Sequence, residues 1–181
     1  MSCGPVPRYC PELPFPPYAH EPGRTPHPGR DPAGHGVGLD TARIFAVDPN
    51  NWAESAAFLY GIDLFNAGFP WEAHEAWEDL WRCYDANTAA ASMLEALIKL
   101  AAASVKASIG NAAGVRRHLA KAAALLATIP DSEVFGLYPM ALRRDLAHPE
   151  PAEAARSRRL PLSLWPGDGP GTLTSDRPPR G

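Results

Sequence analysis

One histidine and several carboxylates lie close together in residues 71–85, and these residue types can bind a cation or transfer a proton. His74 and Glu78 are four residues apart, so a helix places both side chains on one face. Trp81 follows about one turn later and would form an apolar wall beside them. We call these three residues the stripe. Glu75 completes the set of candidate ligand-binding residues in this motif.

A helix over residues 71–85 would bury Trp77 and Leu80, and the stripe would run along the edge of that buried face. Glu75 would point about 100° away from His74. The segment carries five carboxylates and one arginine, a composition that suits either a cation site or a solvated helix face. An apolar wall lowers the local dielectric constant and so strengthens cation binding or proton transfer.

Two familiar metal-binding patterns do not match this segment. The zinc-protease pattern H-E-x-x-H requires a second histidine where Glu78 stands. The Glu-x-x-His pattern of di-iron bundles requires a glutamate where Trp71 stands. A mononuclear divalent site with His74 and Glu78 as two ligands remains, and the cofactor would then be a divalent metal ion. The candidates for its third ligand are His118, Asp63 and Glu95.

A structural interpretation of the same residues stays open. His74 could donate a hydrogen bond that locks two helices together, and Glu78 could pair with Arg82 four residues later. Trp71, Trp77 and Trp81 recur at helical spacing, as aromatic residues of a core do. In this interpretation the stripe packs and forms hydrogen bonds, and it holds no ligand.

The turn before the motif supports the stripe in either interpretation. Gly68 can supply the positive φ that a joint between two helices needs. Asn66 can hydrogen-bond to the backbone of the same turn. Pro70 suits the first turn of the helix that follows, where a missing N–H costs nothing. Asn66, Gly68 and Trp77 are therefore expected to support the site.

The stretch LFNAGFPWEAHEAWEDLW over residues 64–81 closely resembles the domain of unknown function 309 family. That family is known by the motif H-x-x-x-E-x-x-(W/Y), which His74, Glu78 and Trp81 match. The resemblance extends over about residues 50–130. It implies an all-α fold, an undefined activity and a motif suspected of binding metal.

Apolar residues at helical spacing predict an all-α fold, an antiparallel up-and-down bundle of about four helices. Short joints between consecutive helices force neighbouring helices to run antiparallel. A short fifth helix follows the bundle. The predicted helices cover residues 50–66, 71–85, 88–109, 112–128 and 139–147, with Asn50 or Asn51 as the first N-cap.

Proline divides the chain into three parts. Ten prolines fall in the first 32 residues, whereas Pro70 alone lies between Asn50 and Ile129. We therefore expect a disordered Pro/Gly-rich tail over 1–43, a helical domain over 44–148 and a Pro/Arg-rich, mostly disordered tail over 149–181. Four apolar residues of the second tail are expected to dock back on the bundle: Leu160, Leu162, Leu164 and Trp165.

Composition narrows the class of protein. The net charge of −3 and the few arginines of the tails argue against nucleic acid as a partner. No apolar run approaches the length of a membrane span, and no secretory signal pattern is present. Three cysteines cannot form a disulfide scaffold, so we expect a cytoplasmic protein. Its partners are unknown, and the sequence is compatible with a homo-oligomer.

Two functions follow from these observations. The first is an uncharacterised helical-bundle protein whose stripe holds a divalent metal ion or a small ligand. The second is a non-catalytic structural or interaction module in which the stripe only packs and forms hydrogen bonds. The sequence leaves open whether the protein is an enzyme.

Overall fold

The computed structural model describes residues 8–36, 44–147, 151–158, 160 and 162–167. Within these ranges the chain forms six α-helices and one 3₁₀ helix, and no β-strand. The prediction of an all-α fold is therefore confirmed. No helix in the described part of the chain combines the length and the apolarity that crossing a bilayer requires.

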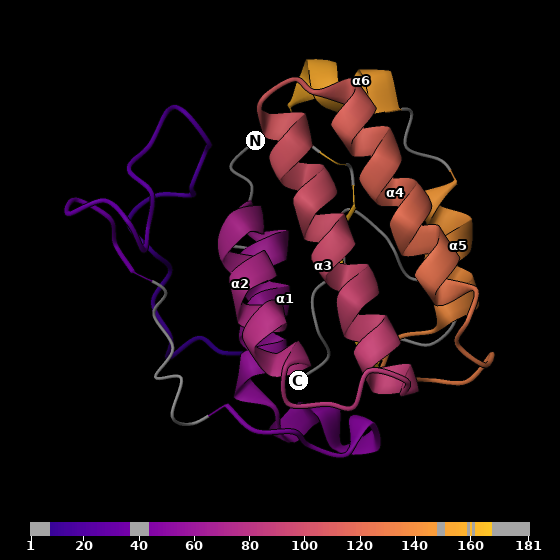
Figure 1. The fold of residues 1–181 in the computed structure, drawn as a ribbon. Coiled ribbons are helices and arrows are strands. Elements are labelled where there is room, and N and C mark those ends of the chain that lie inside the picture. Colours follow the sequence, from indigo (N-terminus) through magenta and orange to yellow (C-terminus); the bar gives the residue numbers. More distant parts are fainter. Residues whose placement is uncertain (1–7, 37–43, 148–150, 159, 161, 168–181) are drawn as a thin grey trace, which may run out of the picture.

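Four helices form the bundle, and each packs against the next one in the chain (Figure 1). Short turns connect them, so neighbouring helices run antiparallel, as predicted. The four are α1 (Ala56–Asn66), α2 (Pro70–Trp81), α3 (Ala89–Ser108) and α4 (Ala112–Leu126).

Two helix boundaries differ from the prediction. Residues 49–54 form a 3₁₀ helix, η2 (Pro49–Glu54), and α1 begins only at Ala56 because the Ser55 side chain caps it by accepting from Phe58 N. The helix α2 ends at Trp81 instead of residue 85. Beyond Trp81 the backbone tightens into i→i−3 hydrogen bonds, from Cys83 N to Leu80 and from Tyr84 N to Trp81, which close the last turn.

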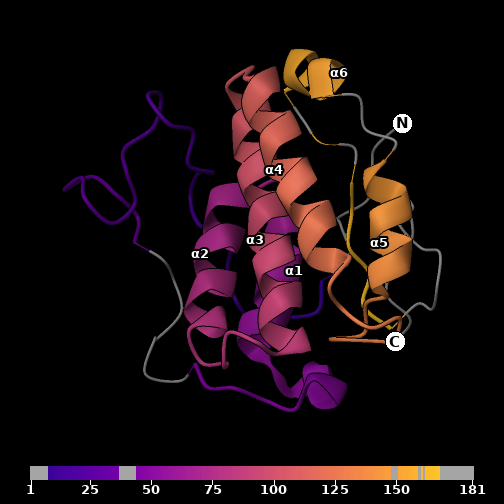
Figure 2. The same cartoon turned by 45° about the vertical axis from the view of Figure 1, so that its right-hand side comes forward.

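Two short helices cover the bundle. The predicted fifth helix is α5 (Pro139–Leu146), which packs against α4. A sixth, α6 (Pro151–Ser157), lies within the tail that we expected to be mostly disordered, and it packs against α3 and α4 at one end of the bundle (Figure 2). Leu160, Leu164 and Trp165 are buried. This part of the tail is therefore docked on the bundle, and residues 168–181 lie outside the described residues.

The N-terminal segment 8–36 contains neither helix nor strand, as predicted, but it is packed rather than free. Its first residues contact α1, and the loop that follows lies on the outer side of α2 (Figures 1 and 2). The buried carboxylate of Asp63 accepts hydrogen bonds from Tyr9 N and Cys10 N, each at 2.8 Å. The prediction of a disordered tail over 1–43 is thus corrected for 8–36, and its remaining residues lie outside the described ranges.

A second carboxylate holds the same segment. The Glu72 side chain is fully buried, and its Oε1 accepts from His20 N at 2.8 Å and lies 3.1 Å from His35 Nε2. Its Oε2 has no hydrogen-bond partner among the described residues. Burial of a carboxylate is costly unless donors satisfy it, so the N-terminal segment supplies donors that α1 and α2 themselves do not.

The C-terminal segment is held by an amide. Asn66 Nδ2 donates to Leu164 O and Leu164 N donates to Asn66 Oδ1, both at 2.8 Å. This double hydrogen bond resembles the pairing between two β-strands. The prediction that Asn66 bonds within its own turn is therefore wrong, because its amide binds a segment 98 residues away. We call Asp63, Asn66 and Glu72 the three anchors.

The tightest contact between α1 and α2 is made by a tryptophan and a glycine. Trp77 is fully buried, and its Nε1 donates to Phe58 O at 3.2 Å. A Cβ atom at Gly61 would lie 2.2 Å from the same Nε1, well inside contact distance. Only glycine therefore allows the two helices to approach this closely.

Replacing Asn66 with alanine should lower the free energy of unfolding by about 2–3 kcal/mol, because Leu164 N and O would be left buried without partners. Urea denaturation measures this loss, and amide exchange at Leu164 should accelerate with it. Asn50→Ala is the matched control, since Asn50 is exposed, and should change stability by less than about 0.5 kcal/mol. Equal losses in the two variants would contradict the role of Asn66.

Gly61→Ala should cost about 1–3 kcal/mol through overpacking against Trp77. In Gly114→Ala, the nearest atoms belong to the flexible Lys106 side chain, so the loss should be smaller. Thermal unfolding of both variants tests the comparison. A Gly61→Ala protein as stable as wild type would show that α1 and α2 can separate without cost.

Candidate functional site

The structure brings three side chains of α2 together. One ligand atom from each of His74, Glu75 and Glu78 can be chosen so that all three lie within 4.8 Å of one another. His74 Nε2 lies 3.6 Å from Glu78 Oε2. All three side chains are partly buried, so the cluster is at the surface and open to solvent on one side.

The start of α2 is set by a helix C-cap in the preceding turn. Gly68 has φ +88°, and the backbone N–H groups of Gly68 and Phe69 donate to Phe65 O and Leu64 O. These two bonds form a Schellman motif, which ends α1. Pro70 then opens α2 at a position where the missing N–H is not needed. The predicted role of Gly68 is thus seen in the structure, and the motif residues follow in fixed helical register.

His74 lies between two groups that favour its charged form. Its Nε2 faces Glu78, and the ring also lies close to the backbone of Ile98 on α3. Burial lowers the pKa of His74, although Glu78 and the Ile98 contact partly offset this effect by raising it. Burial therefore favours the neutral imidazole, which is the form that ligates metals.

The two carboxylates of the cluster have different surroundings. Burial raises the pKa of Glu75, and the nearby charges of Glu78 and Asp79 raise it further. Glu78 Oε1 lies 3.1 Å from Arg82 Nη2, and Asp79 also pairs with Arg82. One arginine thus balances several acids, and a second positive charge would relieve the crowding around Glu75.

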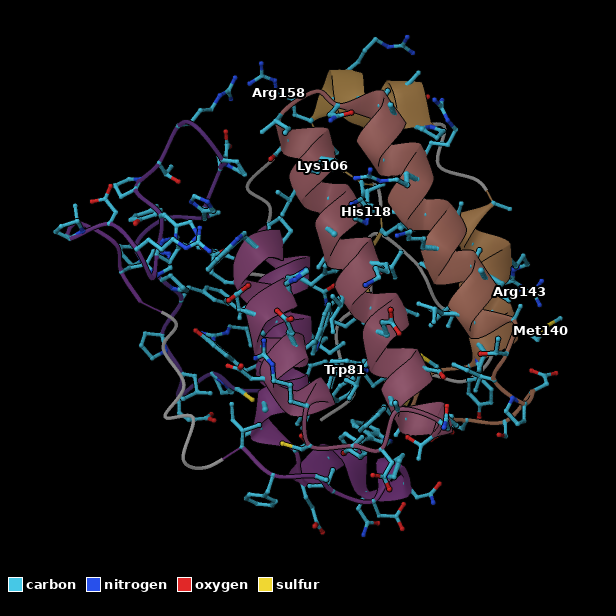
Figure 3. The ribbon with its side chains drawn as sticks, in the orientation of Figure 1. Trp81, Lys106, His118, Met140, Arg143 and Arg158 are labelled. Atoms are coloured by element: carbon cyan, nitrogen blue, oxygen red, sulfur yellow. The ribbon has the colours of Figure 1, made fainter. Side chains whose placement is uncertain are left out.

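The aromatic residues divide between core and surface. Trp77 is fully buried in the core, as expected for a supporting residue. Trp81 packs against the core but is only partly buried, between α2 and α3 (Figure 3). It therefore lies on the edge of the buried face, where the helical spacing placed it.

The structure does not bring the predicted third ligands into the cluster. His118 lies on α4, and its Nδ1 is buried without a hydrogen-bond partner. Burial and the nearby cations Arg117 and Lys106 lower its pKa. Asp63 holds the N-terminal segment, and Glu95 pairs with Lys99 at 3.2 Å. The third side chain that lies within 4.8 Å of the other two is instead that of Glu75.

Sequence reasoning missed the three anchors as a set. A signal existed for Asp63, because it is the single charged residue in the apolar helix α1. Glu72 gave no such signal, since it belongs to an acidic run and its burial depends on residues from another segment.

Residues 58–118 match the sequence model of a family described as Domain of unknown function (DUF309). This match confirms the resemblance to the domain of unknown function 309 family over these residues. No curated protein and no solved structure matches the chain. The DUF309 region includes the cluster His74, Glu75 and Glu78 and all three anchors, whereas the terminal segments that the anchors hold lie outside it.

A histidine titration followed by NMR should give His74 a pKa below the usual 6.5, because burial disfavours the charged ring. Glu78→Gln should lower this pKa further, since the negative charge of Glu78 favours the imidazolium. The exposed Glu133→Gln serves as the control and should leave the His74 pKa unchanged.

The same shift affects stability. Because the unfolded chain takes up the His74 proton more readily, the contribution of His74 to stability is present above pH 6.5 and decreases as the pH falls below it. A His74 pKa above 6.5 would contradict the buried, neutral ring.

Proposed function

We propose that the DUF309 domain of this chain binds a divalent metal ion through His74, Glu75 and Glu78. The observation that carries the proposal is the convergence of one nitrogen donor and two carboxylate donors within 4.8 Å of one another on α2. The position of the imidazole between Glu78 and the Ile98 backbone supports it, because surrounding contacts hold a ligating histidine in place.

The donor set limits which metal ions fit the site. Imidazole favours zinc, iron and similar ions, whereas carboxylates also accept manganese and magnesium. A mixed set of one histidine and two carboxylates therefore fits Zn²⁺, Mn²⁺ or Fe²⁺ better than Ca²⁺. Three protein donors leave coordination positions for water or a substrate, the arrangement of catalytic rather than closed structural sites. Bound metal would supply Lewis acidity or an acidified water there.

The alternative function is a structural or interaction module without metal. The pairing of Glu78 and Asp79 with Arg82 favours it, because these contacts already neutralise part of the cluster. His74 would then serve to join α2 to α3 through Ile98. The two functions differ in what His74 does for the metal-free protein.

Thermal unfolding with EDTA, Zn²⁺ or Mn²⁺ separates the two functions. Metal at about 100 times its dissociation constant should stabilise wild type by about 2.7 kcal/mol, which is roughly 5–10 °C in Tm for a chain of this size. His74→Ala, Glu75→Gln and Glu78→Gln should each reduce or abolish the shift. The shift should also shrink as the pH falls through the His74 pKa, because protonation removes the ligand lone pair.

His118→Ala is the matched control, because it removes a histidine that lies outside the cluster. It should keep the full metal-dependent shift. Absence of any shift in wild type, together with destabilisation of metal-free His74→Ala, would favour the structural module. Loss of the shift in His118→Ala alone would return His118 to the role of third ligand.

A further inference from the structure

A groove of about 530 Å³ lies between α4 and α5, and Pro151 also lines it. Figure 2 shows α5 beside α4, on the opposite side of the bundle from α2. The groove is therefore separate from the candidate metal site. It belongs to α4 and α5, and most of it lies outside the DUF309 match.

Among the described residues, three arginines line the groove and no aspartate or glutamate does: Arg116, Arg143 and Arg144. Arg144 Nε pairs with Asp145 at 3.2 Å. Within the described residues neither Arg116 nor Arg143 pairs with a carboxylate, and Arg143 Nη1 instead lies 3.8 Å from Met140 Sδ. Arg143 and Arg144 also suit the last turn of α5, but Arg116 is far from the C-terminus of α4, so the helix dipole does not account for it.

The floor of the groove is apolar. Leu119 and Leu146 are buried beneath it, and alanines of both helices complete the lining. Met140 stands at the side of the groove near Arg143 and is 52% exposed, a high value for a large apolar side chain (Figure 3). Methionine adapts its shape to irregular apolar ligands, so its position here favours contact with a ligand body.

We infer that this groove binds a small anionic amphiphile, a molecule with a carboxylate or phosphate head and an alkyl or aromatic body. Guanidinium groups recognise both kinds of head through charge-assisted hydrogen bonds. The apolar floor and Met140 would cover the body. A bound anion would also offset the repulsion between guanidinium groups that line one groove.

The dimensions favour a small molecule over a protein segment. The volume lies in the range of about 300–1,000 Å³ that small-molecule sites occupy. The eight residues of α5 give it a length of about 12 Å, comparable with an extended ten-carbon chain. A docked protein helix would need apolar surface well beyond such a short wall.

Methionine-methyl NMR provides a direct readout, because the chain has three methionines. Sodium decanoate, added in EDTA and below its micellar concentration, should shift the Met140 methyl signal in a saturable way. The Met93 signal should stay in place, since Met93 is fully buried on α3. Decyl phosphate in a parallel titration distinguishes a phosphate head from a carboxylate head, and either one bound supports the proposal.

Three variants test the charges. Arg116→Gln and Arg143→Gln should each weaken the Kd of the preferred probe about tenfold, because each removes a charge-assisted hydrogen bond. Arg117→Gln is the matched control: Arg117 is exposed on the same helix but does not line the groove, and its removal should leave the Kd unchanged. Raising the salt concentration should weaken binding of the anionic probes.

Several outcomes would overturn the proposal. These are an unmoved Met140 signal with both probes, an equal loss of affinity in Arg117→Gln, or decyltrimethylammonium binding as tightly as decanoate. Binding of a hexaglutamate peptide without binding of either probe would also overturn it and assign the groove to an acidic protein segment. None of these results bears on the metal site, since all titrations contain EDTA.

Discussion

Burying the carboxylates of Asp63 and Glu72 inside packed helices costs free energy unless hydrogen-bond donors reach them. In this protein most of those donors come from the N-terminal segment, through the backbone of Tyr9, Cys10 and His20. The buried amide of Asn66 likewise depends on the C-terminal segment for its hydrogen-bond partners. These buried groups of α1 and α2 therefore find their hydrogen-bond partners only with both segments in place. The terminal segments outside the residues that match the family model thus take part in the hydrogen bonding of the matched region.

Three faces of the helix α2 contact different parts of the protein. Glu72 faces the N-terminal segment, Trp77 fills the core against α1, and the cluster around His74 faces α3 and solvent. Each of these contacts restrains the rotation of the helix about its own axis. The geometry of the candidate metal site thus depends on packing that lies on the other faces of the same helix, a form of preorganisation by distant contacts.

Local sequence patterns were enough to predict much of the fold. Helical spacing located four helices, Gly68 marked the turn before α2, and the four-residue interval between His74 and Glu78 placed these side chains together. These patterns failed where an interaction joins distant parts of the chain, because such contacts leave no periodic trace. The partner of Asn66 is the example. Likewise, nothing in the sequence of α4 shows that His118 faces cations and not the cluster.

The order of synthesis decides when each of these buried groups can meet its hydrogen-bond partner. A ribosome releases Tyr9 and Cys10 well before Asp63, so the Asp63 carboxylate finds its backbone donors already synthesised. Asn66 has no such advantage, because Leu164 emerges 98 residues later. Until then, the side-chain amide of Asn66 in the nascent chain lacks the backbone N–H and C=O of Leu164. Any nearby unpaired strand, from this chain or another, is a competitor for it until Leu164 arrives.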